Sequence, residues 1–321
     1  MEFAEIRSWA DKVRRNIANV IVGKEEVIDR LLIALAANGH ILLEDVPGTG
    51  KTLLAKTLAK SLDCRFGRVQ FTPDLLPSDL SGIHYFNQKT SDFEFRPGPI
   101  FCHILLADEL NRATPRTQSS LLECMEERQV SVDGVTMKLE RPFFVIATQN
   151  PVENQGTFPL PEAQLDRFMM RISMGYPSAE ESIRILKRFK DDEPLEQVES
   201  VTDREEIVRV QLACRKVLVE DSLYEYIVNI VENTRNHPEV HMGVSPRGSQ
   251  ALLKAAQIHA VFRGRDYMLP DDVKAVAEPV LAHRLLLHDG TGERERQEQV
   301  IRDILQNVPV PAEPWPADRI R

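Results

Sequence analysis

The sequence predicts an α/β domain built on a parallel sheet, followed by a smaller all-helical domain. Up to about residue 175, short apolar runs typical of buried strands alternate with segments whose apolar residues recur at helical spacing. Beyond that point the spacing is helical only, and we expect no further strands. At 321 residues the chain is long enough for two such domains.

Residues 40–62 are the most informative segment and predict a phosphate-binding loop. Residues 41–43 are an apolar run typical of a buried strand, and Leu54, Leu58 and Leu62 then recur at helical spacing. The turn between them reads Pro47-Gly48-Thr49-Gly50-Lys51-Thr52. Its glycines let backbone N–H groups converge on phosphate oxygens, and a helix N-terminus adds partial positive charge. A strand-turn-helix that contains these residues by chance is the alternative, which the complete context disfavours.

Two side chains of this loop carry its chemistry. Lys51 can reach the β- and γ-phosphates of a nucleoside triphosphate, and the Thr52 hydroxyl can ligate Mg²⁺. Asp45 occupies the first glycine position of the motif G-x-x-x-x-G-K-S/T, so the turn must begin differently. The expected nucleotide contacts are Pro47, Gly48, Thr49, Gly50, Lys51, Thr52 and Leu53.

Composition narrows the class of protein. The chain is 42% hydrophobic and 28% charged, as globular proteins are, and it holds no apolar run of the roughly 18 residues that span a membrane. Its first residues lack the apolar core of a signal peptide, so we expect a cytoplasmic protein. The net charge of −9 disfavours a broad basic surface for nucleic acid. The four cysteines form no C-x-x-C pair, which predicts buried thiols rather than disulfides or zinc.

The segment before the loop predicts two helices with a break at residues 20–23. The break is either a plain helix–helix turn or an apolar patch near the adenine base. Val22 and Gly23 are the residues that would line such a patch.

Two acids follow the next buried strand. The apolar run 101–107 ends in Asp108 and Glu109, at the carboxyl end where open α/β sheets place ligands. Asp108 suits a contact with Mg²⁺, and Glu109 suits a base that polarises the attacking water. A strand that merely ends in solvated acids is the alternative, and the phosphate loop disfavours it.

The run 143–147 predicts a further buried strand, which ends at Thr148-Gln149-Asn150. Asn150 would then lie beside the acids and could hydrogen-bond a water or the γ-phosphate. The alternative is a plain turn residue.

Two segments are predicted to form insertions that are not part of the central sheet. The proline- and glycine-bearing stretch 73–99 is long for a connection, which indicates a functional insertion, with a hairpin over residues 83–95. Residues 129–140 alternate on either side of Asp133-Gly134, a favoured two-residue hairpin turn.

Several helix starts and the boundary between the two domains can also be predicted from the sequence. Thr114 before Pro115 predicts an N-cap, as does Ser245 before Pro246. Capping boxes are expected for Ser178 with Glu181 and for Thr202 with Glu205. The acidic stretch 191–203 predicts a linker between a nucleotide domain at 1–190 and a helical domain at 200–306, and 307–321 is a proline-rich tail.

Five motifs in order carry a resemblance: DVPGTGKT, LLADELNRA, ATQNP, LPEAQLDRF and SPRGSQALL. With these, the chain resembles an AAA+ ATPase of the MoxR family over nearly its whole length. The resemblance implies an AAA+ αβα nucleotide-binding domain with a small helical lid, use of ATP and Mg²⁺, and self-association into a ring, usually a hexamer. It implies sensor 1 at Asn150, the arginine finger at Arg167 and the sensor 2 arginine at Arg247. It also implies that 73–99 is the helix-2 insert and 129–140 the pre-sensor hairpin.

Physical arguments leave alternatives for both arginines. Arg167 follows an extended loop and could reach a neighbour's nucleotide, or it could pair with Asp166 on the surface. Arg247 lies in a first helical turn, where a cation opposes the helix dipole. That position suits an arginine that serves a phosphate, although a solvated arginine would also explain it.

Three functions fit these observations. The first is a chaperone-like ATPase that remodels protein partners, which in MoxR relatives often carry a von Willebrand factor A-type domain. The second is a nucleic-acid motor, which the hairpin tip 132–135 disfavours because it has one acid and no base. The third is a nucleotide-gated switch, disfavoured by Glu109, Asn150 and Arg167 together.

Overall fold

A computed structural model describes residues 1–151, 156–190, 193–288 and 293–311. The chain divides into two compact units, Met1–Cys214 and Arg215–Arg321. Most of the predicted tail and part of the loop before Arg167 lie outside the described residues.

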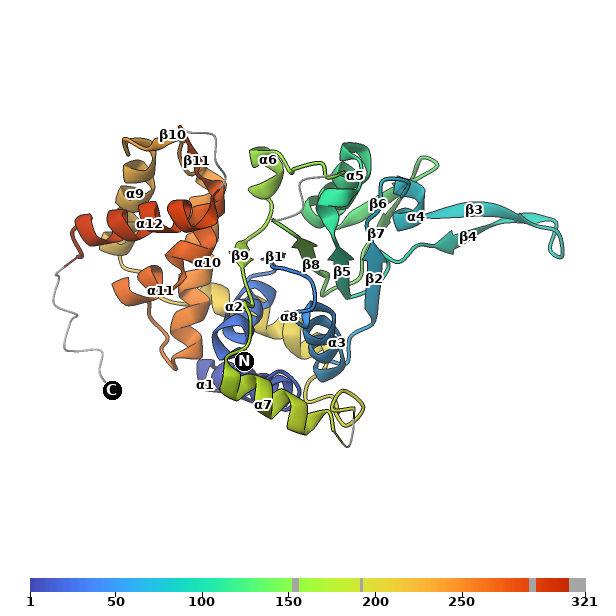
Figure 1. The fold of residues 1–321 in the computed structure, drawn as a ribbon, viewed down its shortest axis with the longest axis horizontal. Coiled ribbons are helices and arrows are strands. Elements are labelled where there is room, and N and C mark those ends of the chain that lie inside the picture. Colours follow the sequence, from blue (N-terminus) through green and yellow to red (C-terminus); the bar gives the residue numbers. More distant parts are fainter. Residues whose placement is uncertain (152–155, 191–192, 289–292, 312–321) are drawn as a thin grey trace. The chain divides into compact units, whose positions relative to one another are not determined.

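Unit 1 is built on a five-stranded parallel sheet of order β2-β5-β8-β1-β9 (Figure 1). Its strands are β1 Ile41–Glu44, β2 Phe66–Gln70, β5 Ile104–Asp108, β8 Phe144–Gln149 and β9 Met170–Ile172. The central strands are continuous apolar runs because helices cover both faces of the sheet. The predicted parallel α/β fold is confirmed. Strand β5 ends one residue beyond the apolar run 101–107, at Asp108, and β8 ends two residues beyond the run 143–147, at Gln149.

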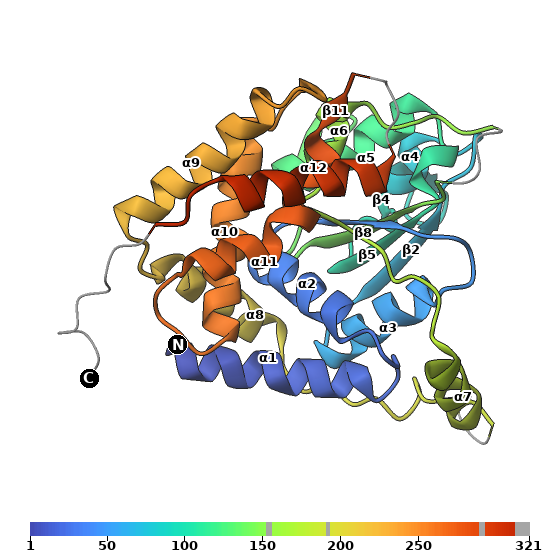
Figure 2. The same ribbon diagram turned by 60° about the vertical axis from the view of Figure 1, so that its left-hand side comes forward.

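The helices of unit 1 form layers on the two faces of this sheet. They are α1 Phe3–Ala18, α2 Glu25–Ala36, α3 Lys51–Ser61, α4 Pro77–Ser81, α5 Pro115–Glu127, α6 Glu162–Leu165, α7 Ala179–Arg188 and α8 Arg204–Ala213. Leu121, Leu122 and Met125 of α5 pack on the sheet face that bears Leu105 and Val145. Figures 1 and 2 show α2 and α3 on the side of the sheet away from α5.

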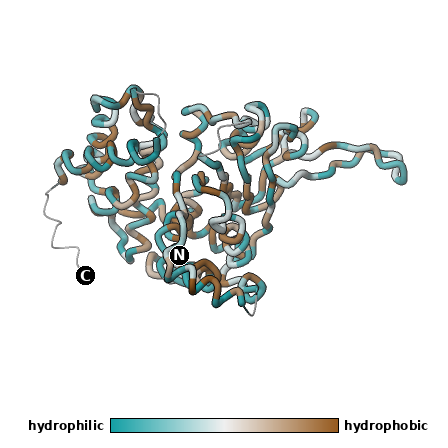
Figure 3. Tube along the Cα trace, viewed as in Figure 1, coloured by the Kyte–Doolittle hydropathy of each residue, from teal (hydrophilic) through white to brown (hydrophobic). Residues whose placement is uncertain are grey.

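Two antiparallel hairpins leave the sheet, as the sequence predicted. Strands β3 Gly82–Asn87 and β4 Asp92–Pro97 extend away from it (Figure 1), and the hairpin tip is hydrophilic (Figure 3). The second hairpin pairs β6 Gln129–Val132 with β7 Val135–Lys138. Asp133 and Gly134 have φ of 50° and 80°, which confirms the two-residue turn.

Unit 2 is mainly helical, with α9 Asp221–Arg235, α10 Pro246–Phe262, α11 Pro270–Leu281 and α12 Arg294–Asn307 (Figure 2). It also contains an antiparallel pair, β10 Val240–Met242 with β11 Leu286–Leu287. The expectation that no strands follow residue 175 was therefore wrong, because β10 and β11 both lie beyond that residue. Strands of three and two residues are too short to leave a periodic signal, and their pairing joins distant segments.

Helix caps were predicted with mixed success. Ser178 and Ser245 cap their helices as expected. The cap expected at Thr202 is wrong: Asp203 accepts the Glu206 N–H at 2.7 Å, while Thr202 accepts a hydrogen bond from the Trp9 indole. Thr114 precedes α5, but its side chain makes no capping hydrogen bond.

The division between the units also differs from the expected boundary. Helix α8 was predicted in the second domain, but it lies in unit 1. Its Ile207 and Val210 are buried, and Gln211 Nε2 donates to the Leu35 carbonyl at 2.8 Å. The acidic stretch is therefore followed by one more helix of unit 1 before the chain enters unit 2.

Two further expectations concern thiols and membranes. The cysteines are free; Cys102, Cys124 and Cys214 are buried, as predicted, and Cys64 is half-buried. Burial raises the pKa of each of these thiols to about 12, so they stay protonated at neutral pH. Within the described ranges, none of the helices is both long and apolar enough to cross a membrane.

Candidate nucleotide-binding site

The phosphate loop joins β1 to α3 through two glycines in left-handed conformation. Gly48 and Gly50 have φ of +86° and +91°, which glycine adopts without steric cost. No atom lies within 4 Å of the point where a side chain on Gly48 would begin. Helix α3 starts at Lys51, and its N-cap residue is Gly50, which has no side chain to cap the first N–H groups. Open space beside the backbone N–H groups of a helix N-terminus is favourable for phosphate.

Lys51 lies between this loop and a group of carboxylates. Its Nζ donates to the main-chain carbonyl of Asp45 at 2.8 Å. Burial of the ammonium lowers the pKa of Lys51, and the nearby carboxylates of Asp45, Asp108 and Glu109 oppose that shift. The lysine is thus held beside the acids that the sequence singled out.

The acids at the end of β5 are fixed by the neighbouring strand β8. Thr148 Oγ1 donates to Asp108 Oδ1 at 2.7 Å and accepts the Glu109 N–H at 2.8 Å. Glu109 has φ of 56° and ψ of 48°, a left-handed conformation that costs a non-glycine residue ~1 kcal/mol. Strain of this kind is concentrated at functional sites.

Three side chains that sequence reasoning missed also hold the acids. Arg68 Nη2 pairs with Asp108 Oδ2 at 2.8 Å, and Gln70 Nε2 donates to Glu109 Oε2 at 2.6 Å. Arg112 Nε lies 3.0 Å from the same Glu109 oxygen. Arg68 and Gln70 are two apart on β2, the strand beside β5. Only that strand adjacency brings them to the acids, and the sequence does not reveal it.

Asn150 directly follows β8, the strand between β5 and β1. It is 7% exposed, and its main-chain carbonyl accepts a hydrogen bond from Asn111 Nδ2 at 3.5 Å. The structure therefore brings Asn150, the acids and the phosphate loop to the carboxyl ends of three adjacent parallel strands, where open α/β sheets bind ligands.

Val22 and Gly23 form a turn between α1 and α2, as the plainer interpretation expected. Val22 is buried, and Gly23 has φ of +69°. A β-carbon on Gly23 would lie 1.7 Å from Glu181 Oε1, so this turn packs directly against the start of α7. Lys24 Nζ donates to the Tyr176 carbonyl at 3.3 Å. Contact with adenine stays a prediction.

The two arginines are placed differently from the strand-end residues. Arg167 lies in unit 1 between α6 and β9, and its Nε is 3.0 Å from Glu126 Oε2 on α5. Asp166 is the surface partner that the sequence suggests for Arg167, whereas the structure pairs Arg167 with Glu126. Arg247 lies in the first turn of α10, in unit 2, as predicted, and its side chain is exposed.

The residues present fit Mg²⁺ and a nucleoside triphosphate. The open space at Gly48 and the N–H groups of α3 suit phosphate oxygens, and the Lys51 ammonium suits their charge. Hydroxyl and carboxylate oxygens are the ligands that Mg²⁺ prefers, and Thr52 with Asp108 would supply them.

Comparison with known proteins establishes the family. Residues 40–170 match the ATPase family associated with various cellular activities (AAA), and residues 232–304 match the AAA lid domain. Chaperone MoxR1 of Mycobacterium tuberculosis is 41% identical, over 92% of this chain and 80% of its own length. The chain belongs to the MoxR family of AAA+ ATPases.

Other proteins are similar to this MoxR-family chain over nearly its whole length. The uncharacterized protein YeaC of Bacillus subtilis is 52% identical, over 94% of this chain and 95% of its own length. A crystal structure of a candidate ATPase from Cytophaga hutchinsonii superposes with a TM-score of 0.88 at 41% identity, covering 96% of this chain and 97% of that one. The predicted family and its α/β fold with a helical lid are confirmed.

Proposed function

We propose that this MoxR-family chain is a Mg²⁺-dependent ATPase that remodels or matures partner proteins. The observation that carries the proposal is the meeting of the phosphate loop, the Asp108-Glu109 pair and Asn150 at one edge of the sheet. Lys51 would bind the β- and γ-phosphates, and Glu109 would polarise the attacking water. Asn150 would orient that water or the γ-phosphate. Mg²⁺ held by Thr52 and Asp108 would neutralise charge on the phosphates.

The test separates nucleotide binding from hydrolysis. Lys51→Ala should weaken ATP binding by about 100-fold, because the phosphate charge loses its partly buried partner. Glu109→Gln should bind ATP as the wild type does but lose about 10²- to 10⁴-fold in hydrolysis rate. Calorimetry gives the affinities and phosphate release gives the rates. Lys56→Ala, an exposed lysine on the same helix, is the control and should change neither. Equal ATP affinity in wild type and Lys51→Ala would contradict the assignment.

We further propose that the active form is a ring, as a hexamer, with nucleotide sites shared between protomers. The support is the family and the position of Arg167 at the end of a loop, outside the strand-end group. In this proposal Arg167 acts on a neighbour's nucleotide, Arg247 of the helical lid senses the γ-phosphate, and Val22 with Gly23 borders the adenine.

The proposed client is a protein, and a protein with a von Willebrand factor A-type domain is the first candidate to test. A relative named as a chaperone supports this class of function. The β3–β4 hairpin presents Phe86 and Phe93, which are 52% and 68% exposed and pair edge to face. The tip of the β6–β7 hairpin presents Val135, 54% exposed, beside Asp133. Apolar side chains without a cluster of lysine or arginine suit a polypeptide better than a phosphate backbone.

A client is identified with a substrate-holding variant. Immobilised Glu109→Gln protein in ATP should retain the client, whereas the Lys51→Ala variant should not. ATPase rates are then measured with the retained protein, single-stranded DNA and double-stranded DNA at moderate salt. We expect stimulation by the protein, reduced when Phe86 and Phe93 are both replaced by serine. Strong stimulation by DNA that is lost in Lys138→Ala would favour a nucleic-acid motor.

A further inference from the structure

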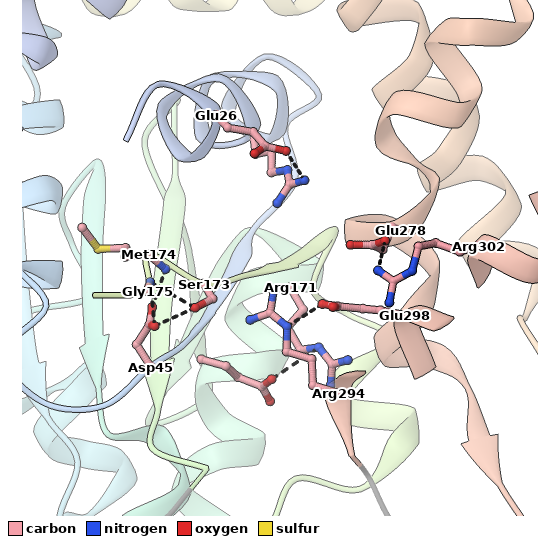
Figure 4. Close-up of polar contacts among 12 residues, drawn as sticks. Glu26, Asp45, Arg171, Ser173, Met174, Gly175, Glu278, Arg294, Glu298 and Arg302 are labelled. Atoms are coloured by element: carbon pink, nitrogen blue, oxygen red, sulfur yellow. Dashed lines mark hydrogen bonds and ion pairs between the residues drawn. The ribbon is translucent and has the colours of Figure 1, made fainter. Parts of the chain in front are cut away.

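Asp45 occupies the position of the first glycine in the phosphate-loop motif, and its side chain is hydrogen-bonded. It is 6% exposed. Its carboxylate accepts three hydrogen bonds: from Ser173 Oγ at 2.7 Å, from the Met174 N–H at 2.6 Å and from the Gly175 N–H at 3.0 Å. Figure 4 shows this cluster. A buried carboxylate is costly unless it is hydrogen-bonded, and these donors satisfy it.

The three donors belong to a segment that contacts the site at two places. The segment follows β9 directly and leads into α7. At its beginning it binds Asp45. At its end, the Tyr176 carbonyl accepts from Lys24 and the Glu181 side chain packs on Gly23. Residues 173–181, which we call the strap, therefore join the phosphate loop to the turn between α1 and α2.

The main chain of Asp45 engages the loop lysine. Its carbonyl accepts the hydrogen bond from Lys51 Nζ at 2.8 Å. One residue thus holds the strap through its carboxylate and the phosphate-binding lysine through its carbonyl. A glycine here would keep the carbonyl but lose the attachment to the strap.

We propose that Asp45 is a positioning residue for nucleotide binding. Its carboxylate fixes the first turn of the phosphate loop to the strap, and this attachment holds Lys51 where the β- and γ-phosphates bind. The inference rests on the proposed nucleotide site and adds a residue that the general motif does not contain. Its consequence is that restoring the glycine of the motif weakens the site.

The decisive variant is Asp45→Gly. We expect its ATP affinity to fall about tenfold or more, with a matching rise in KM, because Lys51 and the loop lose their anchor. The kcat at saturating ATP should stay within about twofold, since Glu109 and Asn150 are held by other strands. Asp45→Asn should be intermediate: its carbonyl oxygen can still accept two of the bonds, but its amide would face the Met174 N–H. Ser173→Ala removes one of the three donors to Asp45, together with the Oγ that accepts the Gly175 N–H at 3.2 Å, and should weaken binding least.

The control is Asp203→Ala in the same unit. Asp203 also accepts a backbone N–H with its carboxylate, at 2.7 Å, but at the start of α8. This variant should lower the melting temperature without changing ATP affinity. Binding is measured by calorimetry, and folding of each variant by thermal denaturation. If Asp45→Gly does not fold, Ser173→Ala and Asp45→Asn decide the question by the same affinity measurement.

Hydrogen exchange of the strap gives a readout that does not depend on catalytic activity. The Met174 and Gly175 amides should exchange faster in Asp45→Gly than in the wild type, and ATP should slow their exchange only in the wild type. Unchanged ATP affinity in folded Asp45→Gly, or equal weakening in Asp203→Ala, would overturn the inference. A wild type with protected strap amides but no ATP binding would instead overturn the proposed function, and the positioning role with it.

Discussion

Two groups of candidate catalytic residues differ in how the fold holds them. Asp108 ends strand β5 and Glu109 directly follows it, and Thr148 of the neighbouring strand β8 fixes both through hydrogen bonds. Lys51 begins helix α3 and donates to the carbonyl of Asp45, which directly follows β1. Arg167 follows a one-turn helix, pairs with Glu126 and is 30% exposed, while Arg247 is exposed on the first turn of α10. The parallel sheet therefore brings the candidate phosphate-binding lysine and the candidate base together within one unit. Arg167 lies outside that group of residues in unit 1, and Arg247 belongs to unit 2.

Replacement of Arg167 tests this difference and should change the hydrolysis rate more than replacement of Thr148 or Arg68. Arg167→Ala should lower hydrolysis by about 10³-fold while ATP affinity changes little, because an arginine finger acts mainly on transition-state charge. Arg30→Ala, which removes another arginine–glutamate pair of unit 1, is the control and should leave the rate unchanged.

Mixing subunits shows whose nucleotide Arg167 serves. Arg167→Ala and Glu109→Gln proteins should each be nearly inactive alone, yet mixed assemblies should regain part of the activity. Recovery requires some sites that combine an intact base with an intact arginine from a neighbour. Absence of recovery in assemblies shown to exchange subunits would place Arg167 within its own chain's site or outside the reaction.

A smaller effect is expected within the strand-end group, at Thr148. Thr148→Val removes the hydroxyl that contacts both acids, so hydrolysis should fall about tenfold, with a loss of about 1–3 kcal/mol in folding stability. Thr234→Val is the control: Thr234 is a buried hydroxyl of unit 2 that also donates one hydrogen bond, to the Val231 carbonyl, and accepts one, from the Val244 N–H. It should lose similar stability and keep its rate. Equal rate losses in both variants would mean that Thr148 acts only through folding.

The smallest expected effect concerns Arg68, which occupies an oxygen of the proposed metal ligand Asp108. Arg68→Ala should lower the Mg²⁺ concentration for half-maximal hydrolysis by up to about fivefold, since Arg68 is 47% exposed and such pairs contribute less than about 1 kcal/mol. Binding of Mn²⁺ in the presence of ATP, followed by its magnetic resonance signal, should tighten in parallel. Arg65→Ala, which removes a pair with Glu140 at the other end of β2, should change neither. A higher Mg²⁺ requirement would mean that Arg68 supports the site rather than competing for it.

Much of the fold and half of the site could be predicted from short segments. The phosphate loop is local chemistry: two glycines, Lys51 and Thr52 follow one another, and their conformations depend on neighbours within a few residues. The buried strands were visible because both faces of the sheet are covered, which makes each run apolar throughout. Asp133-Gly134 and the caps at Ser178 and Ser245 were predicted for the same reason, since a turn or cap is decided within four residues.

Short segments of the sequence therefore specify which polar side chains stand at the end of each strand or helix. Which of these ends lie next to one another depends on how the strands and helices pack. The strand order placed Arg68 and Gln70 of β2 beside Asp108 and Glu109, and it placed Thr148 of β8 in contact with both acids. The donors to Asp45 lie 128 to 130 residues further along the chain. Packing likewise placed α8 in unit 1 and paired β10 with β11. Such contacts depend on how whole elements pack, and the residues between them carry no local signal of the partner.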